Sequence, residues 1–308
     1  MKKVVKIGTR ESQLAVWQAS LVQSLLHKHN NASELVYIKS EGDVDTITPL
    51  YELGVQGIFT KALDAALLNK RIDIAVHSMK DVPTMLAEGI KIAAVLERAS
   101  FKDIIVYKND CSFLEDENGM ATIATSSIRR MAQWLHRYPN HSIENLRGNV
   151  NTRLRKVEEH NWNGAIFAAA GLERIELRPV NSVDLDWMLP APAQGAIVVV
   201  CREDDTDTYG ICNGFNHSDT AICTKIEKDF LRALSGGCST PMSALALVKD
   251  HKIVFKGSIC STDGKQLIEI EKESMYKEAA GLGYKAGNEL LQNVAVQKII
   301  EEIRNAKK

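Results

Sequence analysis

Three short basic segments of the sequence each lie where a strand is expected to turn into a helix. They contain Arg10 with Ser12, then Thr125, Ser127, Arg129 and Arg130, then Arg147, Asn149 and Arg153. The first N–H groups of a helix have no partner inside it, and the helix dipole favours negative charge there. A guanidinium can hold a carboxylate or a phosphate through two parallel hydrogen bonds. The three segments therefore predict a site for a ligand with several acidic groups.

Arg155 follows the third segment and has a simpler explanation. It can pair with Glu158 or Glu159 at helical spacing, so we expect it to be structural.

A fourth segment, Ala-Val-His-Ser-Met-Lys-Asp-Val-Pro, occupies positions 75–83 and follows an apolar run at 72–76. Loops that leave the carboxyl end of a strand in an α/β protein often bear functional groups. This loop offers an imidazole, an ammonium and a carboxylate on His77, Lys80 and Asp81, which suits acid and base chemistry. The structural alternative is a plain turn closed by Asp-Val-Pro. We favour the functional interpretation.

Cys238 lies in the stretch Leu-Ser-Gly-Gly-Cys-Ser-Thr-Pro-Met-Ser, residues 234–243. The two glycines remove side-chain bulk and the proline stiffens the exit, so the thiol is expected to be accessible. The alternative is a small buried side chain, which is the common state of a free cysteine. No neighbouring motif supplies a histidine base, so an acyl-transfer nucleophile is not well supported.

Strand-like and helix-like runs alternate through the first two thirds of the chain, which predicts parallel sheets flanked by helices. Strands are expected at 4–7, 35–38, 72–76, 90–96 and 104–107, and helices after Ser12 and at 59–69. The first helix has one apolar face, formed by Leu14, Trp17, Leu21 and Leu25. The pattern restarts near residue 123, where a strand again runs through Thr into a Ser/Arg turn. Two related α/β lobes with a ligand cleft between them are therefore predicted.

The last third of the chain has a different pattern. An apolar strand at 196–200 precedes a helix at 220–234, three strands at 244–248, 253–259 and 266–271, and one long C-terminal helix. The helix carries Leu290, Leu291, Val294, Ile299 and Ile303. Strands grouped together and followed by a helix indicate a small α+β domain.

Bulk composition narrows the class of protein. The chain has 308 residues and a net charge of −1, which argues against a general nucleic-acid binder. Neither a signal peptide nor an apolar run of about 18 residues is evident, so we expect a cytoplasmic protein without a membrane span. Its six cysteines include no Cys-x-x-Cys pair, and we predict free thiols and no metal site.

Seven motifs in order along the chain resemble those of the hydroxymethylbilane synthase, or porphobilinogen deaminase, family. They are Gly-Thr-Arg-Glu-Ser-Gln-Leu-Ala, Ala-Val-His-Ser-Met-Lys-Asp-Val-Pro, Thr-Ser-Ser-Ile-Arg-Arg, Leu-Arg-Gly-Asn-Val-Asn-Thr-Arg, Ala-Ala-Gly-Leu-Glu-Arg, Pro-Ala-Gln-Gly-Ala and Leu-Ser-Gly-Gly-Cys. The resemblance implies an α/β fold with two lobes like those of a type II periplasmic binding protein and a small α+β C-terminal domain. It implies three domains: residues 1–98 with 195–214, then 99–194, then 215–308. The strand at 197–200 thereby returns to the first domain.

The resemblance also implies a covalent dipyrromethane cofactor, joined by a thioether to Cys238, and porphobilinogen as substrate. Four porphobilinogens are added to this primer with loss of ammonia, and the linear tetrapyrrole is then hydrolysed from it. Asp81 is the implied catalytic residue. The implied contacts to cofactor and substrate are Arg10, Ser12, Lys80, Thr125, Ser127, Arg129, Arg130, Arg147, Asn149, Arg153, Arg174 and Gln194. The protein is expected to be a monomer that binds neither nucleic acid nor membrane.

One departure from the family concerns the loop before the first-lobe helix. Glu52 and Gln56 stand where many members have lysines. The sequence therefore leaves open whether the substrate affinity and the closing motion of this loop match those of the family. Two rival hypotheses follow: a paralogue with weakened activity, and a binding module without catalysis. A transported-ligand binder should have an export signal, and a regulator should have a DNA-binding helix-turn-helix; neither is evident.

Overall fold

The computed structural model describes residues 3–39, 60–237 and 240–305, which form two compact units. The described part of unit 1 comprises residues 3–39, 60–99 and 195–222. The described part of unit 2 comprises residues 100–194, 223–237 and 240–305. The division into three domains remains a prediction. No helix in these ranges is long and apolar enough to cross a membrane.

Unit 1 contains a five-stranded sheet in the order β2-β1-β3-β10-β4. Its strands are β1 (Val5–Thr9), β2 (Ser33–Tyr37), β3 (Ile74–Ser78), β4 (Ile90–Val95) and β10 (Ile197–Arg202). β1 runs parallel to β2 and β3, whereas β10 is antiparallel to both β3 and β4. The expected return of residues 197–200 to this sheet is confirmed. The expectation of a wholly parallel sheet is wrong, because β10 enters from the edge at which β3 ends.

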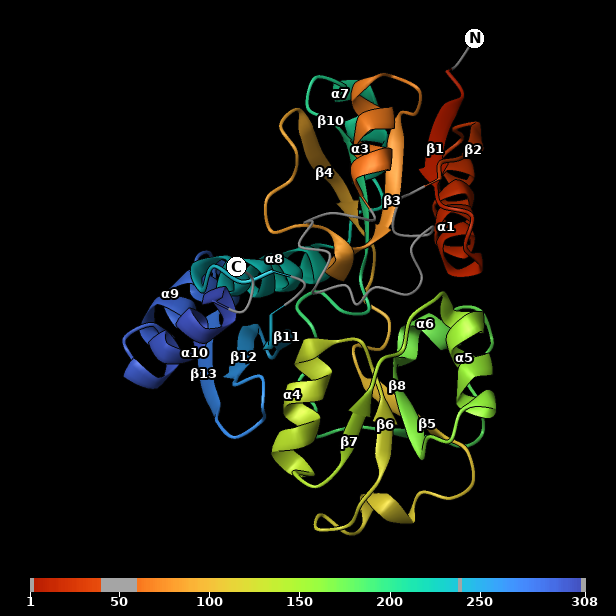
Figure 1. The fold of residues 1–308 in the computed structure, drawn as a ribbon. Coiled ribbons are helices and arrows are strands. Elements are labelled where there is room, and N and C mark those ends of the chain that lie inside the picture. Colours follow the sequence, from red (N-terminus) through yellow and green to blue (C-terminus); the bar gives the residue numbers. More distant parts are fainter. Residues whose placement is uncertain (1–2, 40–59, 238–239, 306–308) are drawn as a thin grey trace. The chain divides into compact units, whose positions relative to one another are not determined.

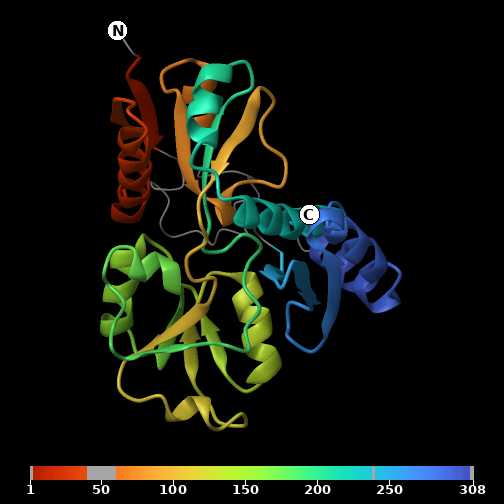
Figure 2. The same ribbon diagram turned by 180° about the vertical axis from the view of Figure 1, so that it is seen from behind.

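Helices cover both faces of this sheet. α1 (Gln13–Lys28) and α7 (Thr206–Asn213) share one hydrophobic core with alternate residues of the strands, and α3 (Lys61–Leu68) packs on the other face (Figures 1 and 2). The face predicted for α1 is confirmed in part: Leu21 and Leu25 pack against the core, but Trp17 is 36% exposed. The buried face is displaced by about one residue. The fully buried residues of α1 include the small Ala15 and Ala19, and small side chains allow a helix to pack close to a sheet.

Unit 2 contains a second five-stranded sheet in the order β7-β6-β8-β5-β9. Its strands are β5 (Asp103–Tyr107), β6 (Thr122–Ala124), β7 (Ser142–Glu144), β8 (Gly164–Ala168) and β9 (Ser182–Asp184). α4 (Ile128–Arg137) covers one face, and α5 (Val150–Glu159) with α6 (Ala169–Glu173) covers the other. Here too the sheet is mixed, because β5 is antiparallel to β8 and β9.

The last part of unit 2 is a small antiparallel sheet, β11 (Met242–Lys249), β12 (Lys252–Cys260) and β13 (Leu267–Met275). α8 (Ser218–Ala233) begins in unit 1 and ends in unit 2, and Phe230 on it packs against Phe255 of β12. The single C-terminal helix predicted from the sequence is wrong. The structure has α9 (Leu282–Leu290) and α10 (Val294–Asn305), and Asn293 Oδ1 accepts a hydrogen bond of 2.9 Å from Ala295 N. An Asn at this position starts a new helix.

The predicted fold class is confirmed. The described residues form two α/β sheets with helices on both faces and a third, smaller sheet with helices.

Candidate active site

In unit 1 the segments containing Arg10 and Asp81 leave the same edge of the sheet. β1 ends at Thr9 directly before Arg10, and its parallel neighbour β3 ends at Ser78. A short 3-10 helix, η1 (Met79–Asp81), continues from β3. Arg10 and Asp81 are both half-buried. The carboxyl ends of neighbouring strands are the usual site of ligand-binding loops in α/β sheets, as the sequence predicted.

Two hydrogen bonds hold the chain just before Lys80 and Asp81. Met79 N donates to Ala196 O at 2.9 Å, and Gln18 Nε2 of α1 donates to Ser78 Oγ at 2.8 Å. The first bond fixes the backbone at the point where β3 becomes η1, and the second holds the side chain of Ser78 against α1. Lys80 and Asp81 are therefore presented by anchored backbone and are both half-buried.

His77 is not available for proton transfer near neutral pH. Burial, followed by the charge of Arg10, lowers the pKa of His77 to about 3. Its Nε2 is buried and has no hydrogen-bond partner among the described residues. The imidazole is therefore neutral, and Asp81 and Lys80 are the ionisable groups left in the predicted loop.

In unit 2 the predicted basic segments meet at one edge of the second sheet. β6 is parallel to β7 and β8, so the turns that follow these three strands leave the same edge. The turns lead into α4, α5 and α6, respectively. β5 is antiparallel to β8 and pairs Asp103 with Ala168, so the amino end of β5 lies at this edge as well. The sequence predicted the turns but not Asp103.

Several predicted polar residues act as helix caps or turn residues. Ser12 Oγ accepts from Ala15 N at 3.4 Å, Ser127 Oγ from Arg130 N at 3.4 Å, and Asn149 Oδ1 from Thr152 N at 2.9 Å. Thr125 Oγ1 accepts from Ser127 N at 3.2 Å. These bonds explain why the residues precede α1, α4 and α5. Contact of these residues with a ligand remains a prediction.

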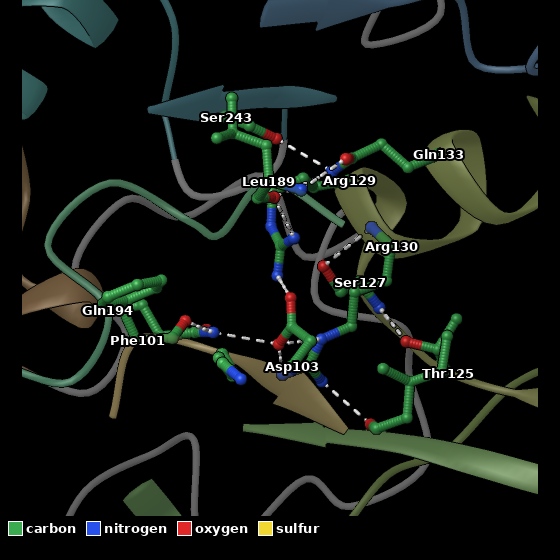
Figure 3. Close-up of polar contacts among 12 residues, drawn as sticks. Phe101, Asp103, Thr125, Ser127, Arg129, Arg130, Gln133, Leu189, Gln194 and Ser243 are labelled. Atoms are coloured by element: carbon green, nitrogen blue, oxygen red, sulfur yellow. Dashed lines mark hydrogen bonds and ion pairs between the residues drawn. The ribbon is translucent and has the colours of Figure 1, made fainter. Parts of the chain in front are cut away.

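Asp103 lies at the centre of the polar network in Figure 3. It is fully buried, and Oδ2 accepts from Arg129 Nη2 at 2.7 Å. Oδ1 accepts from Arg130 Nη2 at 2.7 Å and from Arg130 Nε at 3.0 Å. Gln194 Nε2 also donates to Oδ1, at 2.9 Å, and to Phe101 O at 2.8 Å. Three of the predicted contact residues are thus brought together around a carboxylate that sequence reasoning missed.

The other predicted arginines of unit 2 differ in their burial. Arg147 is 3% exposed, and Arg153 is half-buried with its Nε donating to Gly148 O at 2.7 Å. Burial lowers the pKa of Arg174 to about 10, so its guanidinium is still charged at pH 7. Arg155 is exposed and pairs with Glu159 at 3.3 Å, which confirms the structural interpretation.

The arginines of unit 2 fit a ligand with carboxylate side groups. Arg129 is 4% exposed, yet its Nε is buried without a hydrogen-bond partner among the described residues. A buried N–H without an acceptor is costly, and a carboxylate of a bound dipyrrole is a suitable acceptor. In the part of the chain that the structure describes, no group of three or more His, Cys, Asp or Glu could hold a metal ion.

Cys238, Glu52 and Gln56 lie outside the described residues, and their predicted roles stay predictions. Gly236, before the cysteine, has a packing role that the sequence did not indicate. A Cβ there would lie 2.4 Å from Met242 Sδ and 2.5 Å from Leu231 Cδ1. The packing of Met242 and Leu231 therefore already requires a glycine at position 236.

Each unit thus presents predicted cationic side chains at one edge of an α/β sheet. Residues 5–210 match the family described as porphobilinogen deaminase, dipyromethane cofactor binding domain, and residues 221–292 match the porphobilinogen deaminase C-terminal domain. The chain belongs to the porphobilinogen deaminase family.

Curated relatives agree over nearly the whole length. The chain is 42% identical over 308 residues to the porphobilinogen deaminase of Carboxydothermus hydrogenoformans, covering 99% of this chain and 98% of that one. It is 38% identical to that of Desulforamulus reducens, covering 99% of both chains. Among solved structures, an ancestral cationic amino acid solute binding protein aligns with 69% of this chain and 87% of its own. That alignment has 14% identity and a TM-score of 0.45, too low to support an argument.

Proposed function

We propose that this chain joins four porphobilinogen molecules in a line onto a dipyrromethane primer that it carries covalently. Each addition releases one ammonia, and one water finally hydrolyses the linear tetrapyrrole, hydroxymethylbilane, from the primer. The observation that carries the proposal is the match of the cofactor binding domain to residues 5–210, a span that contains Asp81 and every predicted arginine. The chain is then a transferase of porphyrin and haem biosynthesis.

Cys238 is the proposed attachment point, through a thioether. When bound, the dipyrromethane supplies the pyrrole α-carbon that acts as the nucleophile. The hydrogen bonds between Gly237 and Thr240 support the proposal, because they tie together the chain on the two sides of the attachment point. Thr240 Oγ1 donates to Gly237 O at 2.7 Å, and Thr240 N donates to the same oxygen at 3.1 Å.

Asp81 is the proposed catalytic residue. Porphobilinogen becomes an electrophilic cation when the C–N bond of its aminomethyl group breaks and the nitrogen leaves as ammonia, with the methylene carbon kept on the pyrrole. A carboxylate near the pyrrole N–H stabilises that cation. The same carboxylate can accept the proton lost when the new carbon–carbon bond forms. The anchored backbone before Asp81 supports this role, since a catalytic group must be held in a defined place.

The arginines are proposed to bind the acidic side groups of the growing chain. Each porphobilinogen adds one acetate and one propionate, so the number of carboxylates rises with every step. The proposed contacts are Arg10, Arg129, Arg147, Arg153 and Arg174, with Lys80, Ser12, Thr125, Ser127, Asn149 and Gln194 as further polar contacts. Arg130, whose three nitrogens donate to Asp103 or to Ile166 O, is proposed to support Arg129 from within the protein. Bidentate pairing of guanidinium with carboxylate suits this task.

The test is turnover of porphobilinogen by the purified protein, with ammonia and tetrapyrrole measured together. Four ammonia per tetrapyrrole supports the proposal, and no consumption of porphobilinogen overturns it. Asp81→Asn should lower kcat by about 10²- to 10⁴-fold, the usual range for loss of an acid or base. Glu88→Gln is the control, because Glu88 is an exposed carboxylate in the same loop region and outside the proposed site.

We also propose that the protein acts as a monomer in the cytoplasm. The family supports this proposal. Light scattering on the purified protein tests it, and a stable dimer at micromolar concentration would overturn the monomer.

A further inference from the structure

Asp103 is a charged side chain in a fully buried position. It begins β5, is 0% exposed, and is followed by the apolar Ile104 and Ile105. Removing a carboxylate from water is costly unless it is paired and its oxygens are hydrogen-bonded. Arg129, Arg130 and Gln194 meet this need, as Figure 3 shows.

The two arginines are used differently. Arg130 donates from Nε and Nη2 to Asp103 Oδ1, and from Nη1 to Ile166 O at 2.9 Å, so all three of its nitrogens bind the protein. Arg129 donates from Nη2 to Asp103 Oδ2 and from Nη1 to Leu189 O at 2.9 Å. Its Nε has no hydrogen-bond partner among the described residues. Arg130 therefore holds Asp103, whereas Arg129 keeps one buried N–H that no described residue accepts.

The charges in this cluster give the same division of roles. Two guanidinium groups and one carboxylate leave a single net positive charge, so the pair of arginines offers one charge to a ligand. Without the carboxylate the two adjacent guanidinium groups would repel each other in a buried site, where charges interact more strongly than in water. Asp103 is thus what allows both to be buried.

We propose that Asp103 is a positioning residue that fixes Arg129 for binding an acidic side group of the dipyrrole or of the growing chain, with Arg130 acting through Asp103. This inference rests on the function proposed above. Gln194 belongs to the same arrangement, since it donates to the oxygen that Arg130 holds. None of these roles requires Asp103 to contact the ligand.

The purely structural alternative is a buried ion pair that only stabilises the sheet. The positioning role and the structural role predict different kinetics in a double variant. If Asp103 acts on the ligand through Arg129, replacing Asp103 has little effect on kcat/KM once Arg129 is replaced. Asp103→Asn is the informative change. It keeps one oxygen for Arg130 and Gln194, but it turns an amide N–H toward Arg129 Nη2.

Asp73 offers a matched control. It is 6% exposed and accepts from Lys6 N at 2.9 Å and from Arg202 Nη2 at 3.4 Å. It precedes β3, at the end of that strand opposite to Asp81. Asp73→Asn therefore breaks a buried contact of the same type outside the proposed site.

The experiment measures kcat/KM per cofactor-loaded chain for both Asn variants, alone and combined with Arg129→Gln. Asp103→Asn should lower kcat/KM by about tenfold or more alone, and by less than about threefold when Arg129→Gln is present. Asp73→Asn should change kcat/KM by less than about threefold, and by the same factor in the wild type and in Arg129→Gln. The second readout is the fraction of purified chains that carry the dipyrrole, by intact mass, which should fall in Asp103→Asn and not in Asp73→Asn.

An equal effect of Asp103→Asn in both backgrounds, or wild-type kinetics and cofactor content, overturns the inference. If Asp103→Asn does not fold, Arg130→Lys takes its place, because it keeps the charge and loses the two-nitrogen hold on Oδ1. Its effect must also vanish with Arg129→Gln, or the inference fails. A wild-type protein with neither dipyrrole nor turnover overturns the proposed function itself, whereas an active wild type with uncoupled variants overturns only the role of Asp103.

Discussion

Replacement of Glu227 should destabilise unit 2 by an amount that the structure allows us to work out. Glu227 lies on α8 and is 0% exposed. Its Oε2 accepts from Ala193 N at 2.6 Å, and its Oε1 accepts from Ala246 N on β11 at 2.7 Å. The carboxylate therefore ties α8 to a strand and to the residue before Gln194.

Glu227→Ala leaves two buried backbone N–H groups without their acceptor. Each hydrogen bond to a charged group contributes about 1.5–3 kcal/mol, so the loss in free energy of unfolding should be about 3–6 kcal/mol. Glu227→Gln retains one oxygen acceptor and should lose about half of that amount. Ala193 has a φ of 64°, a left-handed backbone that an alanine adopts at some cost, so this bond also holds a strained residue.

Urea unfolding followed by circular dichroism measures these changes. Glu271→Gln is the surface control, because Glu271 is exposed and pairs only with Lys256 among the contacts described, and it should unfold at nearly the wild-type urea concentration. A Glu227→Ala variant within about 1 kcal/mol of the wild type would refute the reasoning, as would a Gln variant less stable than the Ala variant.

Two further outcomes follow from particular contacts. A Cβ on Gly283 of α9 would lie 2.0 Å from Ile226 O, so Gly283→Ala should push α9 away from α8 and lower the Tm. A Cβ on Gly210 of α7 would have no atom within 4 Å, so Gly210→Ala should raise the Tm slightly. Equal changes in Tm for the two variants would contradict this account. The pKa of His77 is about 3 in the fold against 6.5 in the unfolded chain, so between these values the unfolded state binds more protons and stability falls as pH is lowered. Between pH 7 and pH 5 the free energy of unfolding of His77→Gln, measured in urea, should therefore fall by about 2 kcal/mol less than that of the wild type. An equal fall in both proteins would show that His77 is not the group responsible.

Local patterns in the sequence were sufficient to predict most elements and the basic turns. Ser12, Ser127 and Asn149 are recognisable as residues that begin helices, and each does cap one. The apolar runs gave β3 and β10 because a buried strand needs no information from distant residues to be recognised. The family resemblance placed β10 in the first sheet, which no local pattern could do.

The errors and omissions all depend on long-range contacts. The strand directions in both sheets depend on where the chain returns, and the buried face of α1 depends on which side chains allow close approach to the sheet. Asp103 looked like an ordinary residue at a strand boundary, because its partners lie 26, 27 and 91 positions away. A charged residue followed by an uninterrupted apolar run was the one available signal.

The central claim is that this chain builds a tetrapyrrole on a primer attached to Cys238, and the most direct test is the mass of the intact protein. Protein purified from cells that make porphobilinogen should exceed its sequence mass by one covalent dipyrrole, and further additions should appear after brief exposure to porphobilinogen. Cys238→Ser should have the unmodified mass. A wild-type protein with the unmodified mass, or a Cys238→Ser variant that keeps the dipyrrole, would contradict the claim.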